Sequence, residues 1–185
     1  MHYRCPQYTL VLDIDETLVH CSTDERFSDC DIVLDVDGMA VFVRTRPNLH
    51  TFLEEASKIF EIITFTAGHH KYASALLNAI DPEGSLIQHR IYRDCCYITS
   101  GRKYVKNLNI LGRDLDRTVI VDNSLEAFGF QLENGILIGS WFGDDTEDDE
   151  LMRLLAVLRR MVDGRERVPD FIRRTLDNAG KVSSL

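Results

Sequence analysis

Two aspartates, Asp13 and Asp15, follow a short apolar run at Tyr8–Leu12, and Thr17 lies two residues further on. The run is rich in aliphatic residues, which predicts a buried strand. Ligands of open α/β sheets bind beyond the carboxyl ends of the strands, so a nucleophile and a hard metal ion would be placed at this tip. Two neighbouring carboxylates repel each other, and a cation or a proton must offset their charge.

Three further segments carry polar residues in a fixed order: Phe65-Thr66-Ala67, Tyr104-Val105-Lys106 and Val119-Ile120-Val121-Asp122-Asn123-Ser124. The first ends a strand-like run, the second supplies a basic residue, and the third is a second apolar strand with an acidic tip. Asp-x-Asp-x-Thr followed by these segments resembles the haloacid dehalogenase superfamily of aspartate-nucleophile phosphotransferases. Four motifs in order are much harder to obtain by chance than one.

Longer stretches narrow this resemblance to the small phosphatases that act on the C-terminal domain of RNA polymerase II: Asp15–His20, Thr66-Ala67 with Lys71-Tyr72, Leu111–Leu115 and Ser140–Phe142. The likeness runs from about residue 9 to 162. It implies an α/β fold of the haloacid dehalogenase type, a Rossmannoid three-layer sandwich with a central, mostly parallel sheet. It further implies a small β-hairpin insertion after the first strand, and no stretch between the motifs is long enough for a large cap domain.

Phosphoester cleavage needs a nucleophile, charge neutralisation and a proton for the leaving oxygen. Asp13 is the predicted nucleophile, forming an aspartyl-phosphate, and Asp15 the predicted acid and base; the resemblance gives these residues the same roles. Mg²⁺ prefers oxygen ligands. The resemblance implies that Asp13, Asn123 and the main-chain carbonyl of Asp15 bind it, with Asp122 holding groups around the metal or a metal-bound water.

Four more residues are expected at the site. Thr66 can donate its hydroxyl to a phosphoryl oxygen, and Lys106 supplies a positive charge that also screens the nucleophile. Arg93 is predicted to contact the substrate, because a planar guanidinium suits bidentate phosphate binding. Thr17 is grouped with Arg93 on the substrate side, although its hydroxyl is expected to order the turn or the Asp13 carboxylate rather than to react.

Alternating strand-like and helix-like patterns predict a largely parallel sheet with helices on both faces. Strands are expected at 8–12, 62–65, 118–121 and 135–138, with a short one at 91–92. Asp37-Gly38 between two apolar runs is a strong hairpin signal. Helices are expected from Pro47 at the first helical position through Phe60, around 72–79, and along the apolar stripe of Leu151 to Leu158. The acidic residues at 144–150 are expected to cap this last helix.

The 185 residues are interpreted as a single phosphatase domain, with a core at about 9–162 and a charged tail at 163–185 that frays near Ser183-Ser184. The net charge of −9 argues against direct nucleic-acid binding. Five cysteines without paired spacing indicate reduced thiols, and no apolar run approaches membrane-spanning length. We therefore expect an intracellular protein, nuclear or cytoplasmic. The resemblance and the lack of a large cap imply that it acts on a phosphorylated protein segment, with the RNA polymerase II C-terminal domain as one candidate, and a monomer is expected.

The substrate pocket matches the family less closely than the catalytic motifs. His69 stands where relatives carry an apolar residue, Asn107 where an Asp is usual, and Phe27 comes later than the usual aromatic. Leu34, Val36 and Val41 are candidates for an apolar groove. Two alternatives to a protein phosphatase stay open: a phosphopeptide-binding or scaffolding module with a vestigial site, and a small-metabolite phosphatase of the same superfamily. A Ca²⁺-binding EF-hand loop is disfavoured, because it would need glycine at the position of Leu18.

Overall fold

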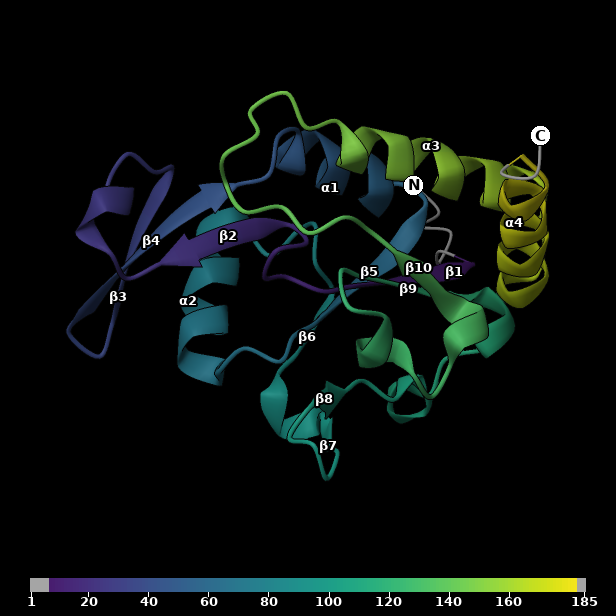
Figure 1. The fold of residues 1–185 in the computed structure, drawn as a ribbon, viewed down its shortest axis with the longest axis horizontal. Coiled ribbons are helices and arrows are strands. Elements are labelled where there is room, and N and C mark those ends of the chain that lie inside the picture. The colour runs from purple at the N-terminus through teal and green to yellow at the C-terminus, as the bar shows by residue number, and fades with distance from the viewer. Residues whose placement is uncertain (1–6, 183–185) are drawn as a thin grey trace.

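The computed structural model describes residues 7–182, and its centre is a five-stranded parallel sheet (Figure 1). The strand order is β10-β9-β1-β5-β6, which places β1 in the middle. The strands are β1 (Tyr8–Leu12), β5 (Phe60–Phe65), β6 (His89–Ile91), β9 (Thr118–Asp122) and β10 (Gly135–Leu137). All five residues of β1 are buried, as its continuous apolar sequence predicts for a strand covered on both faces.

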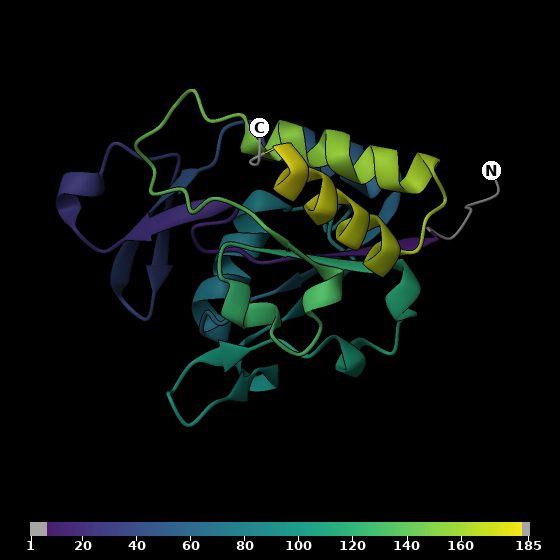
Figure 2. The same ribbon diagram turned by 45° about the vertical axis from the view of Figure 1, so that its right-hand side comes forward.

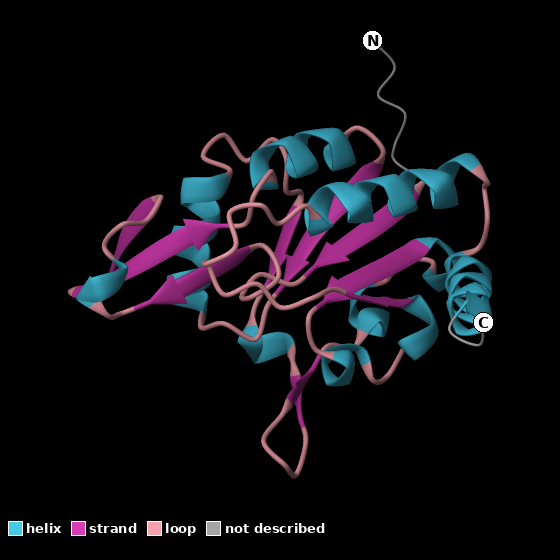
Figure 3. Ribbon diagram, turned by 45° about the horizontal axis from the view of Figure 1, so that its top comes forward, coloured by secondary structure: helices cyan, strands magenta, loops and turns pink. Residues whose placement is uncertain are grey.

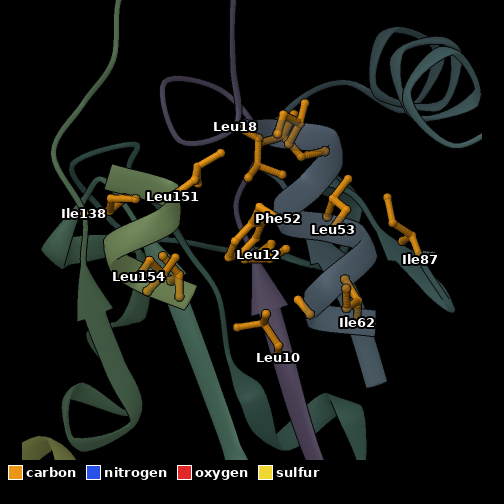
Figure 4. Close-up of a cluster of buried hydrophobic side chains, with 14 of the residues drawn as sticks. Leu10, Leu12, Leu18, Phe52, Leu53, Ile62, Ile87, Ile138, Leu151 and Leu154 are labelled. Atoms are coloured by element: carbon orange, nitrogen blue, oxygen red, sulfur yellow. The ribbon is translucent and has the colours of Figure 1, made fainter. Parts of the chain in front are cut away.

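Alternate residues of the strands face two separate cores. Leu10, Leu12 and Ile62 point to the face covered by the α-helices, where they pack against Phe52 and Leu154 (Figure 4). The helices α1 and α3 lie side by side above the sheet, and α4 crosses next to α3 (Figures 2 and 3). The four helices that contribute to this core are α1 (Leu49–Ser57), α2 (His70–Ile80), α3 (Glu150–Asp163) and α4 (Val168–Val182).

The opposite face is covered by short 3-10 helices rather than by α-helices. Val11 and Ile63 point to this face and pack with Leu108 and Phe128. The 3-10 helices on this side are η2 (Arg93–Cys95), η3 (Leu108–Leu111), η4 (Leu115–Arg117), η5 (Leu125–Phe128) and η6 (Leu132–Asn134), and the ribbon β7 (Tyr97–Ile98) with β8 (Tyr104–Val105) lies beside them. A further 3-10 helix, η1 (Glu25–Phe27), lies instead in the insertion that follows β1. The sheet therefore lies between two unlike layers.

A small antiparallel sheet follows β1 and extends away from the body of the protein (Figure 1). Its order is β2-β4-β3, with β2 (Val19–Ser22), β3 (Ile32–Val36) and β4 (Met39–Thr45). The two-residue turn between β3 and β4 has φ values of 55° at Asp37 and 83° at Gly38. Positive φ at both positions is the type I′ geometry that such a sequence favours. The predicted fold, with its hairpin insertion and no large cap, is confirmed, while β2 was not predicted.

Several predicted boundaries are wrong for local reasons. Pro47 does not begin α1: the cap is Asn48, held in the left-handed region at φ 65°, and helical geometry starts at Leu49. Phe60 belongs to β5 instead of α1, because the chain turns at residues 58–59 and then pairs with β1. The short strand predicted at 91–92 is β6, shifted two residues earlier to pair with β5. The strand predicted at 135–138 ends one residue early, at Leu137.

The hydrophobic core extends past residue 162, where only a charged tail was expected. Val168, Phe171 and Ile172 of α4 are buried in the main core. The apolar face of α4 is interrupted by charged residues at helical spacing, so composition alone did not reveal it. Leu34 and Val41, two candidates for lining an apolar groove, are also buried in this core, and the third candidate, Val36, is partly buried against it. Ser183-Ser184 lie outside the described residues.

A buried ion pair ties the acidic segment to the small sheet. The Arg46 side chain is 1% exposed and donates to both carboxylate oxygens of Asp148 at 2.8 Å. It also donates to the carbonyls of Thr17 (3.1 Å) and Gly139 (3.0 Å). Asp148 accepts from the Glu150 N–H at 3.2 Å, so the predicted capping role holds for this one residue. Its main role is to neutralise the buried Arg46 guanidinium, whose hydrogen bond to the Thr17 carbonyl supports the turn after β1.

None of the helices within residues 7–182 is long and apolar enough to cross a membrane.

The cysteines of the described segment are free thiols: Cys21, Cys30, Cys95 and Cys96.

Asp148→Ala is expected to lower the free energy of unfolding by about 3 kcal/mol, because it leaves a buried guanidinium without its counter-charge. Denaturant titration of both proteins measures this loss. Asp149→Ala is the matched control. Asp149 pairs with Arg153 on the surface, where the two side chains are 55% and 68% exposed, so its loss should stay within about 0.5 kcal/mol. Equal losses in the two variants would contradict the bracing role of Arg46.

The same pair predicts a pH dependence of stability. Hydrogen bonds from Arg46 hold the pKa of Asp148 below its ordinary value of 3.8. A depressed pKa in the folded state stabilises the protein above the unfolded pKa, and this contribution is lost as the pH falls through the folded pKa. The difference in Tm between wild type and Asp148→Ala should therefore be constant above about pH 5 and shrink below pH 3.8. A difference that persists unchanged at lower pH would contradict this assignment.

Candidate active site

The carboxyl ends of three neighbouring strands bring the predicted residues together. Asp13 follows β1, Thr66 follows β5, and Asp122 ends β9. Because β1 pairs in parallel with both neighbours, their tips lie along one edge of the sheet. The Asp13 N–H donates to Val121 O at 3.0 Å and so continues the β1–β9 pairing as far as Asp13. These residues line a cleft of about 460 Å³.

A tight turn after β1 holds the two predicted catalytic carboxylates. Glu16 adopts φ 58°, an uncommon conformation for a residue with a side chain. Its N–H donates to Val19 O at 2.8 Å, and its carbonyl accepts from the Trp141 N–H at 2.9 Å. The segment that contains Trp141 is the same one that Asp148 ties to Arg46. The positions of Asp13 and Asp15 therefore depend on contacts far along the chain.

Lys106 is the central cation of the site. Its side chain is 2% exposed, and Nζ lies 2.5 Å from Asp13 Oδ1 and 2.6 Å from Asp122 Oδ2. Burial alone would lower the pKa of Lys106, but the two adjacent carboxylates outweigh it and raise the pKa above its ordinary value. The ammonium is therefore charged at neutral pH, and its interactions hold Asp13 and Asp122 on either side of it.

Asp15 points to a different set of partners. Its Oδ1 accepts a hydrogen bond of 2.5 Å from the Tyr72 hydroxyl, while Thr66 Oγ1 lies 3.5 Å from Oδ2. Burial raises the pKa of Asp15 to about 6, opposed by the Tyr72 hydrogen bond and assisted by the charge of Asp13. A carboxyl group with this pKa can both give and take a proton near neutral pH.

The cleft carries more negative than positive charge. Burial, with the charge of Asp13, raises the pKa of Asp122 to about 6. The other oxygen of Asp122 accepts from the Ser124 N–H at 2.8 Å, so both oxygens have donors. Three carboxylates thus lie around one lysine, and the excess of negative charge favours the binding of a further cation.

Thr66 lies at the close approach between the β5 tip and α2. Its Oγ1 accepts from the Gly68 N–H at 2.7 Å and donates weakly to Asp15 Oδ2 at 3.5 Å. A Cβ on residue 68 would lie 3.0 Å from this oxygen and 3.4 Å from Asp15 Oδ2. Glycine at position 68 therefore keeps open the space in front of these two groups.

Thr17 does not line the cleft. It is fully buried, and its hydroxyl donates to Asp13 Oδ2 at 2.9 Å, with Asn123 Oδ1 at 3.4 Å. The assignment of Thr17 to substrate binding is therefore wrong, because no cleft surface reaches it. The hydroxyl instead orients the Asp13 carboxylate, which is the other role that the sequence suggested.

Arg93 does line the cleft, at the side formed by β8. Its Nε donates to Ala67 O at 2.5 Å, and the guanidinium lies over the Tyr104 ring, 5.1 Å from its centroid. One edge of the guanidinium is used by these contacts. The terminal N–H groups remain for an anion in the cleft.

The donor atoms at this edge suit a hard divalent cation. Asn123 Nδ2 donates to Ser140 Oγ at 3.0 Å, which turns Oδ1 toward Thr17 and the Asp13 carboxylate. Oxygen atoms of a carboxylate and an amide are ligands that Mg²⁺ accepts. Within residues 7–182, no group of three or more His, Cys, Asp or Glu side chains could hold a metal on its own. A cation here would need main-chain, water and phosphate oxygens as well.

Sequence reasoning missed Cys21, Ser140 and the partnership of Arg46 with Asp148. Tyr72 and Ser140 belonged to motifs that carried the resemblance, but nothing in their spacing indicated contact with Asp15 or Asn123. Cys21 lies on β2, a strand that the sequence did not predict. Burial, opposed by its hydrogen bond with Tyr72, raises the pKa of the Cys21 thiol to about 12.

A parallel α/β sandwich with Asp-x-Asp-x-Thr after its central strand, and with Lys106 against the first aspartate, defines a member of the haloacid dehalogenase class. The profile of the NLI interacting factor-like phosphatase family matches residues 8–170, and the chain belongs to this family.

Curated relatives carry phosphatase names. The chain is 47% identical over 156 residues to CTD small phosphatase-like protein 3 of Caenorhabditis elegans, covering 83% of this chain and 54% of that protein. It is 45% identical to CTD small phosphatase-like protein 2 of Dictyostelium discoideum, over 86% of this chain and 28% of that protein. The chain thus spans about half or less of the length of these relatives.

A solved structure of Fcp1, described as an essential RNA polymerase II CTD phosphatase, has the same fold. It superposes with a TM-score of 0.74 at 18% sequence identity, covering 91% of this chain and 70% of that one.

Lys106→Met is expected to lower the free energy of unfolding at neutral pH by about 3 kcal/mol, because two buried carboxylates lose their counter-charge. Adding Asp122→Asn in the same protein removes one of these charges and should recover part of the loss. Urea titration of the wild type, the two single variants and the double variant gives a double-mutant cycle, which measures the interaction between the two residues. Additive effects would show that Lys106 and Asp122 do not act as a pair.

Proposed function

We propose that this protein is a Mg²⁺-dependent protein serine/threonine phosphatase that hydrolyses phosphoserine esters through an aspartyl-phosphate on Asp13. The observation that carries the proposal is the pairing at one strand tip of a buried, lysine-bound carboxylate with a second carboxylate whose pKa is about 6. The names of the relatives support phosphatase chemistry. The fit of Asp13 and Asn123 oxygens to a hard cation supports the metal.

In the first step an oxygen of Asp13 attacks phosphorus, and the bond from phosphorus to the serine oxygen breaks. The leaving oxygen takes the proton of Asp15. Lys106 and the Thr66 hydroxyl stabilise the charge on the phosphoryl oxygens, and Arg93 can bind the phosphate or its flanking peptide. Thr17 keeps the Asp13 carboxylate in its attacking orientation.

In the second step a water molecule attacks the same phosphorus, and the bond to Asp13 breaks. Asp15, now ionised, takes the proton of the water and returns to its starting state. Asp13, Asn123 and the Asp15 carbonyl would hold a Mg²⁺ ion, which would supply charge neutralisation for the phosphoryl oxygens. Asp122 contributes through Lys106, because its oxygens already accept from Lys106 and the Ser124 N–H.

An open cleft favours a phosphorylated, flexible protein segment as substrate. The insertion after β1 is a small sheet and does not form a large cap over the site. The C-terminal domain of RNA polymerase II is one candidate, because the names of relatives refer to it. We include in this proposal a monomer in the nucleus or cytoplasm that does not bind nucleic acid directly, in line with the net charge of −9.

Asp13→Asn should abolish Mg²⁺-dependent phosphate release from a phosphoserine peptide and from an aryl phosphate, lowering kcat by about 10³-fold or more because the nucleophile is lost. Asp116→Asn is the control, since Asp116 lies on the surface in a pair with Arg167. EDTA should abolish wild-type turnover, and Mg²⁺ should restore it.

Three outcomes would contradict the proposal. Turnover in Asp13→Asn would exclude this nucleophile. Binding of phosphopeptide without turnover by the wild type would favour a scaffolding module. Strong activity on one small metabolite with weak peptide activity would favour a metabolite phosphatase.

A further inference from the structure

Two residues outside the predicted catalytic set, Tyr72 and Cys21, form a chain of hydrogen bonds that ends on Asp15. The Tyr72 hydroxyl on α2 lies 2.5 Å from Asp15 Oδ1, and Cys21 Sγ on β2 lies 2.7 Å from the same hydroxyl. Three elements therefore meet at this carboxylate: the turn after β1, the small sheet and α2. The proposed reaction gives no role to Tyr72 or Cys21.

The donor and the acceptor in each of these hydrogen bonds follow from the number of protons that each group carries. A phenol has one hydrogen to donate, and an ionised carboxylate can only accept. When Tyr72 donates to Asp15 Oδ1, the thiol of Cys21 must be the donor to the phenol oxygen. A thiol and a phenol have ordinary pKa values of about 8.5 and about 10, so each group has one proton to donate at neutral pH.

The two oxygens of Asp15 consequently differ. Oδ1 has a close donor, whereas the nearest hydroxyl to Oδ2, that of Thr66, is 3.5 Å away. Oδ2 also faces the space that glycine at position 68 leaves open. The oxygen that can carry a transferable proton is therefore Oδ2, on the side where the Thr66 hydroxyl lies.

We propose that Tyr72, oriented by the Cys21 thiol, is a positioning residue that fixes the Asp15 carboxyl so that Oδ2 donates the proton to the leaving oxygen. The inference rests on the proposed phosphatase function and deepens it. In the first step the Oδ2–H bond breaks as the leaving oxygen takes the proton. In the second step Oδ2 takes a proton from the attacking water, and Tyr72 remains a donor to Oδ1 throughout.

The test uses the dependence of rate on the leaving group. A poor leaving group, such as the serine oxygen of a phosphopeptide or the oxygen of phenyl phosphate, needs protonation, whereas p-nitrophenolate leaves without it. Tyr72→Phe keeps the ring and removes the hydroxyl. We expect kcat/KM to fall about tenfold or more for the phosphopeptide and phenyl phosphate, and by about threefold or less for p-nitrophenyl phosphate, because a general acid contributes about 10²- to 10⁴-fold.

Matched variants separate positioning from packing. Asp15→Asn should show the same leaving-group pattern more strongly, and Tyr72→Phe should add little in its background, because both act through one proton. Cys21→Ser retains a donor and should keep the wild-type pattern. Tyr97→Phe, on the exposed ribbon strand β7, is the control for loss of a tyrosine hydroxyl. It should leave kcat/KM unchanged for all three substrates.

Equal losses in Tyr72→Phe for all leaving groups, no loss at all, or full additivity with Asp15→Asn would each overturn the positioning role. These results are distinguishable from failure of the proposed function itself. In that case the wild type would release no phosphate from any of the three substrates, or Asp13→Asn would be as active as the wild type.

Discussion

The buried ammonium of Lys106 between Asp13 and Asp122 is the interaction on which the rest of the site depends. Three carboxylates at the edge of one sheet would repel each other in a poorly solvated cleft, and the lysine offsets part of that cost. Its two short contacts also define the geometry, because they hold the tips of β1 and β9 at fixed positions around one charge. The charge that remains uncompensated is what suits the site to a divalent cation and a phosphate together.

The supporting structure is as important as the charged residues. The Thr17 hydroxyl orients Asp13, and the carbonyl of the same residue accepts from Arg46, which Asp148 neutralises. This sequence of contacts links Asp13, the proposed nucleophile, to a segment about 130 residues away, and a functional side chain needs such supporting contacts to keep its geometry. On the other side Tyr72, which is itself bonded to Cys21, donates to Asp15. The two carboxylates, two residues apart in the chain, are therefore positioned by separate parts of the fold.

The fold explains how one short motif can be surrounded by all of these polar groups. A parallel sheet delivers its strand tips to one edge, and β1 at its centre has a neighbour on each side that contributes a polar residue. The small sheet formed by β2, β3 and β4 adds Cys21 at this edge and leaves the cleft open. An open cleft and a hydrogen bond from the half-buried Tyr72 to Asp15 are thus compatible, since the phenol approaches from α2 and not from the cleft.

By itself the sequence determined the family, the parallel α/β class and the hairpin at Asp37-Gly38, because each depends on local pattern or on ordered motifs. It also indicated the polar residues that meet at this edge of the sheet: Asp13, Asp15, Thr66, Lys106, Asp122 and Asn123. Only the tertiary structure decided between the two roles suggested for Thr17. It alone decided that Tyr72, which is bonded to Cys21, donates to Asp15, and that Arg46 pairs with Asp148. It also decided that α4 joins the core, where its few apolar residues find partners. These outcomes depend on contacts between distant segments, whose geometry no spacing along one chain specifies.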